Sequence, residues 1–164
     1  MRSDVPHKDY RACVGIMLIN ARGLVFVGQR AEADFVGAWQ MPQGGIDRGE
    51  APRAAALREL GEEVGTRHAE VIAEHPDWLR YDLPADTVRR TWRGRYRGQC
   101  QKWFAMRFLG RDRDIRLDAH HREFTQWKWV EMDAVLRLII PFKRAVYQAV
   151  VDEFRHLGVP AAGA

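Results

Sequence analysis

Cysteines are scarce in this sequence, and long apolar runs are missing. The 164 residues include two cysteines, Cys13 and Cys100, which lie in separate apolar segments without metal-binding spacing. We therefore expect buried free thiols rather than a disulfide. No apolar run approaches the roughly 18–20 residues of a membrane span, and the opening MRSDVPHKDY lacks the apolar core of a signal peptide. These absences argue against membrane-spanning and secreted classes and predict a cytoplasmic protein.

Internal repeats, linkers and low-complexity segments are missing as well. Hydrophobic residues make up 46% and charged residues 29% of the chain, which is typical of a soluble globular domain. The length suits one domain with a hydrophobic core. We expect that domain to span residues 8–157, with flexible tails at 1–7 and 158–164.

Acidic residues are absent from one basic segment. The formal net charge is +4, and residues 89–102 (RRTWRGRYRGQCQK) hold six basic residues and no acid. Such a segment can attract a polyanion. It can equally be a solvated surface loop, and charge alone leaves both interpretations open.

Periodicity and turn residues predict a mixture of strands and helices. Pro52 and Gly65 suit the first turn and the stop of a helix over 51–64. A second helix is predicted from Pro141 to about residue 156, and a glycine-rich loop without regular structure over 42–49. The predicted strands are residues 10–20, 24–29, 71–74, 78–81, 102–109 and 126–130. This pattern indicates an α+β fold with one or two helices packed on a mixed sheet.

The predicted helix at 51–64 gathers three glutamates. At roughly 100° per residue, one stripe is apolar and the other side is acidic. The stripe is Leu57, Leu60 and Val64, and the acids are Glu59, Glu62 and Glu63. Like charges at this spacing repel, and the last turns of a helix disfavour anions.

A bound metal ion would explain this crowding. The glycine-rich PQGGIDRGE leads directly into the helix, and its glycines let the backbone approach a ligand closely. Clusters of oxygen ligands suit Mg²⁺ or Mn²⁺. Arg58 lies four residues before Glu62 and is expected to pair with it. We therefore predict a divalent cation between the carboxylates, the alternative being a solvated acidic face.

A longer pattern surrounds the glutamates. Gly44 is followed by five residues, Glu50, seven residues and RELGEEVG at 58–65. This spacing resembles the Nudix box, the signature of hydrolases that act on nucleoside diphosphates linked to another moiety. The likeness covers 23 residues and departs at Thr66, where a bulky apolar residue is usual. That departure weakens a packing contact and touches no carboxylate.

The resemblance extends over about residues 8–156. The segments YRACVGI, WQMPQGGID, WLRYDLP, GQCQKWF, EFTQWKWV and PFKRAVY are similar to the RNA pyrophosphohydrolase branch of the family. This branch also includes dinucleoside polyphosphate hydrolases and similar plant enzymes. The resemblance implies the Nudix fold, an α/β/α sandwich in which a mixed sheet lies between helices and the box forms a loop–helix–loop.

The resemblance also implies roles for individual residues. Arg58 resembles an orienting arginine and Glu50 a structural residue of the box. The implied Mg²⁺ ligands, which Mn²⁺ or another divalent cation can share, are the carboxylates of Glu59, Glu62, Glu63 and Glu123 and the carbonyl of Gly44. Glu63 and Glu123 both remain candidates for the general base.

Substrate contacts are implied at a second group of positions. Arg11 and Arg30 match residues that face the phosphate chain. Phe142 and Lys143 match residues that line a base pocket, although a helix start with a core aromatic explains them equally well. Tyr81 is a candidate for base stacking or ordinary packing. Weaker candidates are Gln43, Lys102 and the arginines of 89–97.

Three functions follow from these interpretations. The first is a Mg²⁺-dependent pyrophosphohydrolase that acts on the 5′ end of triphosphorylated or diphosphorylated RNA and so begins mRNA decay. The second is hydrolysis of dinucleoside polyphosphates, converting diadenosine tetra- or pentaphosphate to ATP plus AMP or ADP. The third is a non-catalytic nucleotide or RNA sensor, against which the intact glutamates argue. The partners are then 5′-phosphorylated RNA or dinucleoside polyphosphates, with no membrane and no obligate protein partner.

Overall fold

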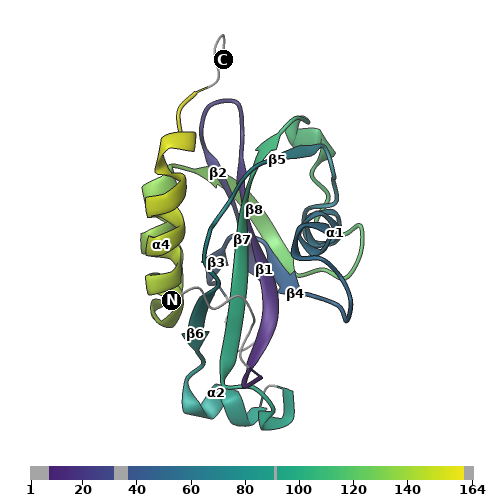
Figure 1. The fold of residues 1–164 in the computed structure, drawn as a ribbon. Coiled ribbons are helices and arrows are strands. Elements are labelled where there is room, and N and C mark those ends of the chain that lie inside the picture. Colours follow the sequence, from purple (N-terminus) through teal and green to yellow (C-terminus); the bar gives the residue numbers. More distant parts are fainter. Residues whose placement is uncertain (1–7, 32–36, 91, 161–164) are drawn as a thin grey trace.

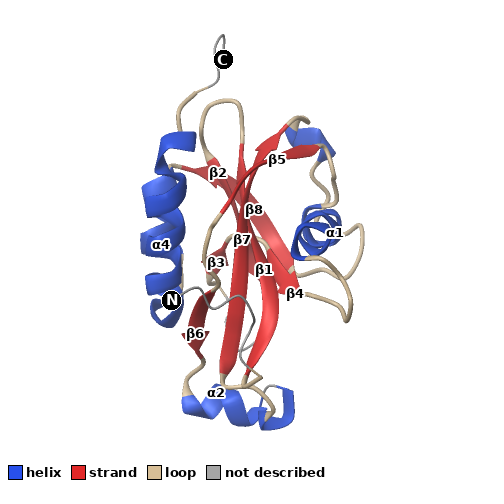
Figure 2. Cartoon of the chain, in the orientation of Figure 1, coloured by secondary structure: helices blue, strands red, loops and turns tan. Residues whose placement is uncertain are grey.

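The fold is a mixed β-sheet with helices on both faces (Figures 1 and 2). The computed structural model describes residues 8–31, 37–90 and 92–160. The tails expected at 1–7 and at the end of the chain therefore lie outside the described residues, except for 158–160. The strands are β1 (Tyr10–Ile19), β2 (Val25–Arg30), β3 (Trp39–Gln40), β4 (Gln43–Gly45), β5 (Ala69–Glu74), β6 (Leu79–Asp82), β7 (Gly98–Phe108) and β8 (Phe124–Val130). The helices are α1 (Pro52–Val64), α2 (Ala85–Arg90), α3 (Val135–Leu138) and α4 (Arg144–Phe154).

Two long parallel strands, β1 and β7, form the centre of the sheet. Their register runs from Tyr10 opposite Gly98 to Ile19 opposite Arg107. The strand order is β3-β2-β1-β7-β5, and the remaining strands add β4 to β1, β6 to β7 and β8 to β2. Both central strands are mostly apolar and buried, as expected for strands covered on both faces.

A hydrophobic core lies on each face of the sheet. Helix α4 covers one core, in which Tyr147 and Phe154 pack near Trp103. Helix α1 covers the other, in which Leu60 and Val64 pack near Phe104. Figure 1 shows the two helices on opposite sides of the strands. The expected α/β/α sandwich is confirmed.

Helix α1 begins and ends where the sequence predicts. Pro52 occupies its first turn, and Gly65 adopts a left-handed φ of 78° while its N–H donates to the Gly61 carbonyl. Thr66, which departs from the Nudix box, is buried and its hydroxyl accepts the His68 N–H at 3.1 Å. The helix predicted from Pro141 begins as a 3₁₀ turn and becomes α4 at Arg144.

Some predicted elements differ from the structure. The loop expected over 42–49 contributes the short strand β4, because Gln43 and its neighbours pair with the distant β1. Strand β7 begins at Gly98, earlier than predicted, inside the basic segment. Short helices α2 and α3 were not predicted, and neither has the length that makes helical periodicity visible.

The two cysteines are both free and buried, as predicted. Within the described ranges, no helix is long and apolar enough to cross a membrane.

Candidate active site

Helix α1 divides its glutamates between two environments. Glu59 and Glu63 are buried, whereas the Glu62 side chain is 43% exposed. Strand β4 packs beside the helix and covers Glu59 and Glu63. The alternative of a solvated acidic face was therefore wrong for these two glutamates. At Gly44 a Cβ would lie 2.0 Å from the Glu59 carboxyl carbon. The glycine is thus required by the close approach of the carboxylate.

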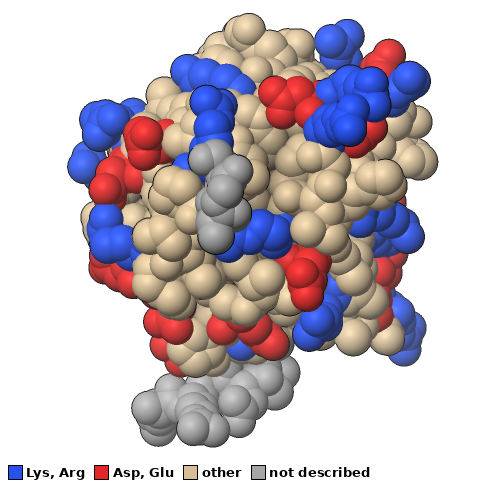
Figure 3. Space-filling view, turned by 90° about the horizontal axis from the view of Figure 1, so that it is seen from above, with Lys and Arg blue, Asp and Glu red and all other residues tan. Residues whose placement is uncertain are grey.

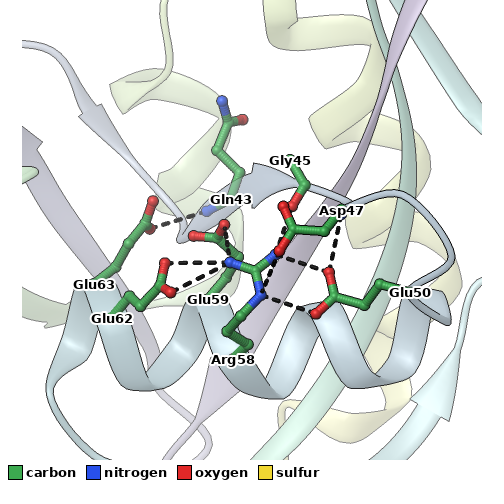
Figure 4. A network of polar contacts seen from close by, with 8 residues as sticks. All are labelled: Gln43, Gly45, Asp47, Glu50, Arg58, Glu59, Glu62 and Glu63. Carbon is green, nitrogen blue, oxygen red and sulfur yellow. Dashed lines mark hydrogen bonds and ion pairs between the residues drawn. The ribbon is translucent and has the colours of Figure 1, made fainter.

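Arg58 is the centre of the polar network at this place (Figure 4). Its Nη1 donates to Glu59 at 3.0 Å and to Glu62 at 3.2 Å, so the predicted Arg58–Glu62 pair is confirmed. Its Nε and Nη2 donate to Glu50, each at 2.8 Å, and Nη2 also reaches the Gly45 carbonyl at 2.8 Å. One guanidinium therefore ties the glycine-rich loop to the glutamates of the helix.

The environment shifts the pKa of these carboxyl groups in opposite directions. Hydrogen bonds from Arg58, helped by the Asp47 N–H, lower the pKa of Glu50 to about 2. Burial raises the pKa of Glu59 to about 7, although Arg58 opposes the shift. Burial also raises the pKa of Glu63, and the charges of Glu59 and Glu123 add to the effect. Two carboxylates are therefore held in a place that disfavours their negative charge.

A cavity of about 460 Å³ opens over the glutamates. Its walls come from the start of β1, from β4, from α1 and from the segment before β8. The lining residues are Arg11, Gln43, Gly44, Gly45, Glu59, Glu62, Glu63, His120, His121 and Glu123. The structure thus brings Glu123 and Arg11 to the box glutamates, as the resemblance implies. His120 and His121 were not predicted, and the sequence HHREF that carries them offers no periodicity from which to predict them.

The donor atoms in this cavity fit a hard divalent cation. Its carboxylates supply oxygen ligands, and Gly44 lies in the wall beside them. Among the described residues, no three acidic, histidine or cysteine side chains converge closely enough to hold a metal as they stand. The reason is local, because Arg58 draws Glu59 and Glu62 towards its own Nη1 and the Gln43 N–H holds Glu63 at 3.1 Å.

A second group of candidate residues gathers on the α4 face of the sheet. The rings of Tyr81 and Phe142 are 5.8 Å apart, and Lys143 Nζ lies 5.5 Å from the Tyr81 ring. Buried Gln40 accepts hydrogen bonds from Lys143 Nζ at 3.3 Å and from Arg30 Nη1 at 3.4 Å. Gln40 was not predicted from the sequence, although a polar residue between Trp39 and Met41 is the signal that could have revealed it.

The weaker candidates lie elsewhere. Lys102 forms an ion pair with Glu74 at 3.4 Å and is not part of the cavity wall. In the basic segment Arg93, Arg95 and Arg97 are exposed, and Arg97 pairs with Asp82 at 3.1 Å. This segment lies near α2 at one end of the sheet (Figure 1). Arg93, Arg95 and Arg97 are not among the residues that line the glutamate cavity.

Comparison with known proteins identifies relatives along nearly the whole chain. The family model described as NUDIX domain matches residues 9–150. The RNA pyrophosphohydrolase of Roseobacter denitrificans is 57% identical over 153 residues, covering 92% of this chain and 95% of that protein. The RNA pyrophosphohydrolase of Nitrobacter winogradskyi is 55% identical over 161 residues, covering 94% and 95%.

Solved structures share the fold at lower identity. A C. elegans Ap4A hydrolase binary complex has a TM-score of 0.65 at 16% identity, covering 89% of this chain and 98% of that one. The E. coli dihydroneopterin triphosphate pyrophosphohydrolase has a TM-score of 0.64 at 21% identity, covering 88% and 99%. At such identities the likeness is one of fold alone.

Proposed function

The chain belongs to the NUDIX domain family, and from this we propose that it removes pyrophosphate from the 5′ end of RNA. It is a hydrolase of phosphoric anhydride bonds. The observation that carries the RNA substrate is the identity of 57% and 55% to two RNA pyrophosphohydrolases that it matches almost from end to end. We assign this activity to one domain over residues 8–157 and place it in the cytoplasm.

The cavity supplies the groups that hydrolysis of a polyphosphate needs. Hydrolases of this family generally depend on a divalent metal. We propose that Mg²⁺, or Mn²⁺ in its place, is held by Glu59, Glu62, Glu63, Glu123 and the Gly44 carbonyl. When bound, such a cation neutralises the phosphate chain and lowers the pKa of water.

The remaining steps fall to the side chains of the chain itself. Arg11 packs on Gly45, where a Cβ would lie 2.4 Å from its Nη2, and in that position its guanidinium faces the cavity. We propose that it stabilises charge on the transferred phosphates. Glu63 or Glu123 accepts the proton of the attacking water. The products are 5′-monophosphate RNA and pyrophosphate. If the terminal phosphates are removed one at a time, phosphate is released in place of pyrophosphate.

The first nucleotide would bind on the α4 face. Tyr81 and Phe142 offer aromatic surface, and the Lys143 ammonium lies beside them. Base–aromatic stacking is tolerant of sequence. Arg30, linked to Lys143 through Gln40, would contact the phosphates between the base and the carboxylates.

Dinucleoside polyphosphate hydrolysis is the second candidate. The same carboxylates would cleave diadenosine tetraphosphate, and the fold is shared with the C. elegans Ap4A hydrolase. The sensor alternative has less support, because a binding module does not require four carboxylates in one cavity.

A side-by-side assay tests the proposal. Short RNAs with 5′-triphosphate or 5′-diphosphate ends are compared with diadenosine tetraphosphate in Mg²⁺, and kcat/KM and products are measured. We expect the RNAs to have the higher kcat/KM and to yield monophosphorylated ends. A higher value for the dinucleotide would establish the second function instead. Absence of turnover with every substrate, in Mg²⁺ and in Mn²⁺, would leave the sensor.

A further inference from the structure

A chain of buried amide side chains leads from the sheet interior to the candidate substrate site. Gln99, Gln101 and Trp103 alternate along β7, so their side chains lie on one face. This is the face that α4 covers, because Trp103 contacts the Tyr147 ring there. All three side chains are buried. Gln101 reaches Gln43, whose amide continues the chain into the site.

The Trp103 indole N–H determines the direction of every hydrogen bond in this series of side chains. The Trp103 indole N–H can only donate, and it donates to Gln101 Oε1 at 3.0 Å. The Nε2 of Gln101 must then face the other way. It donates to Gln43 Oε1 at 3.0 Å and to Gln99 Oε1 at 2.8 Å. The orientation of the Gln101 amide is therefore set by the tryptophan.

The same logic orients Gln43. Because its Oε1 is taken by Gln101, its Nε2 points away from the sheet interior. Burial raises the pKa of the Tyr81 hydroxyl, and the Gln43 amide beside it opposes that shift, as a donor would. An amide turned the other way would set two N–H donors against each other in a buried place, which leaves both unsatisfied. Gln43 is thus held with its donor towards Tyr81 and the substrate site.

The backbone around Gln43 is built to permit this arrangement. Gly15 pairs with both Gln43 and Trp103, and a Cβ at Gly15 would lie 2.3 Å from the indole Cε2. The indole therefore fits beside Gln43 because residue 15 has no side chain. The Gln43 backbone N–H meanwhile donates to Glu63 at 3.1 Å. One residue thus connects the carboxylate cavity with the Tyr81 side of the site.

We propose that Trp103 and Gln101 are positioning residues that hold the Gln43 amide as a hydrogen-bond donor to the bound 5′ nucleotide. This inference rests on the proposed function, because it needs a nucleotide between the carboxylates and Tyr81. Neither positioning residue touches the substrate. Their effect passes through the orientation of one amide, so it belongs to substrate binding and not to the chemical step.

The experiment uses Trp103→Phe, which removes the indole N–H and keeps an aromatic ring. With 5′-triphosphate RNA, KM should rise about five- to tenfold, the worth of one hydrogen bond, while kcat stays within about twofold. In a Gln43→Leu background the same substitution should leave KM unchanged, because the amide it orients is gone. The matched control is Trp129→Phe, since Trp129 donates its indole N–H to Asp112 on the other face of the sheet. It should leave KM at the wild-type value.

Several results would overturn the inference. One is an unchanged KM in Trp103→Phe, and another is an equal rise of KM with and without Gln43. If Trp103→Phe does not fold, Gln101→Leu carries the same prediction and the same double-variant comparison. If Trp103→Phe only loosened packing, it would lower the melting temperature equally in the wild-type and Gln43→Leu backgrounds. Its effect on KM would then not depend on Gln43. If the wild-type protein does not hydrolyse the RNA, the proposed function fails, whereas an active wild type with unchanged variants defeats this inference alone.

Discussion

A single arginine organises the charged residues of the site. Arg58 hydrogen-bonds Glu50 and Gly45 on the loop side and Glu59 and Glu62 on the helix side. Its planar guanidinium can serve both sides because its donors point in fixed directions. Glu59 and Glu62 of α1 therefore share one cation that the protein itself supplies, the Arg58 guanidinium. A bound metal would have to compete with that cation for Glu59 and Glu62.

Glu62 offers the clearest test of the metal assignment. Replacing it with glutamine keeps the shape and removes the negative charge that a cation would bind. We expect Glu62→Gln to lower kcat by about two orders of magnitude or more. Stability should change by less than about 0.5 kcal/mol because the side chain is half-exposed. Thermal unfolding and turnover over a range of Mg²⁺ concentrations measure both. Full activity at every concentration would show that Glu62 does not hold the metal.

Glu50 makes stability depend on pH. Its pKa in the folded protein is lowered from the ordinary 4.5 to about 2, chiefly by hydrogen bonds from Arg58. The stabilisation is therefore complete above about pH 4.5 and is lost as pH falls towards 2. In urea unfolding with a chelator present, wild type should exceed Glu50→Gln in free energy of unfolding near neutral pH. The gap should close below pH 4.5, and a gap that is independent of pH would contradict this account.

At the scale of the element, the position of α1 depends on how its C-terminal end is held. The chain turns at Gly65 with a φ of 78°, and there it packs against the backbone of Arg116, which donates its N–H to the Val64 carbonyl. This turn sends β5 back to the sheet beside β7. The end of α1 is therefore joined both to the sheet and to the segment that carries Glu123.

Gly65→Ala and Gly49→Ala separate backbone strain from steric clash. Both glycines have left-handed φ values, 78° and 77°. A Cβ at Gly65 would lie 2.2 Å from the Arg116 carbonyl oxygen, whereas a Cβ at Gly49 meets nothing within 4 Å. Gly49→Ala should cost about 1 kcal/mol for the backbone conformation alone. Gly65→Ala should cost at least about 1 kcal/mol more. Chemical denaturation measures both, and equal losses would mean that the contact with Arg116 relaxes freely.

At the scale of the whole molecule, charge is spread unevenly. The net charge is +4, yet the end of the molecule seen from above carries acidic and basic side chains interspersed (Figure 3). The exposed arginines 93, 95 and 97 follow α2 at the other end of the sheet (Figure 1). A long polyanion would be attracted by the positive charge of these arginines. A small substrate in the carboxylate cavity would not reach them.

Salt should therefore weaken activity on RNA more than activity on a dinucleotide. Raising salt from about 50 to 200 mM should lower kcat/KM for a 5′-triphosphate RNA more steeply than for diadenosine tetraphosphate. Arg95→Gln should make the RNA dependence shallower, since Arg95 is exposed beside Tyr96. The control Arg155→Gln lies after α4, far from α2 (Figure 1), and should not. Equal salt dependence for both substrates would assign the basic segment to ordinary solvated surface.

The sequence alone determined those features that depend on neighbours along the chain. Pro52 and Gly65 predict the bounds of α1 because capping and left-handed stops are local properties of the backbone. The spacing of Glu59, Glu62 and Glu63 predicts a carboxylate cluster for the same reason. The resemblance to the Nudix family also predicted the sandwich fold and the RNA pyrophosphohydrolase branch.

Only the tertiary structure decided how distant segments meet. Strand β4 pairs with β1 and lies beside α1, and this buries Glu59 and Glu63 while Glu62 stays half-exposed. Gln40 joins Arg30 to Lys143 across segments far apart in sequence, and Trp103 orients Gln43 through Gln101. Burial and hydrogen-bond direction arise from strand pairing between remote residues. Local periodicity carries no information about such pairing.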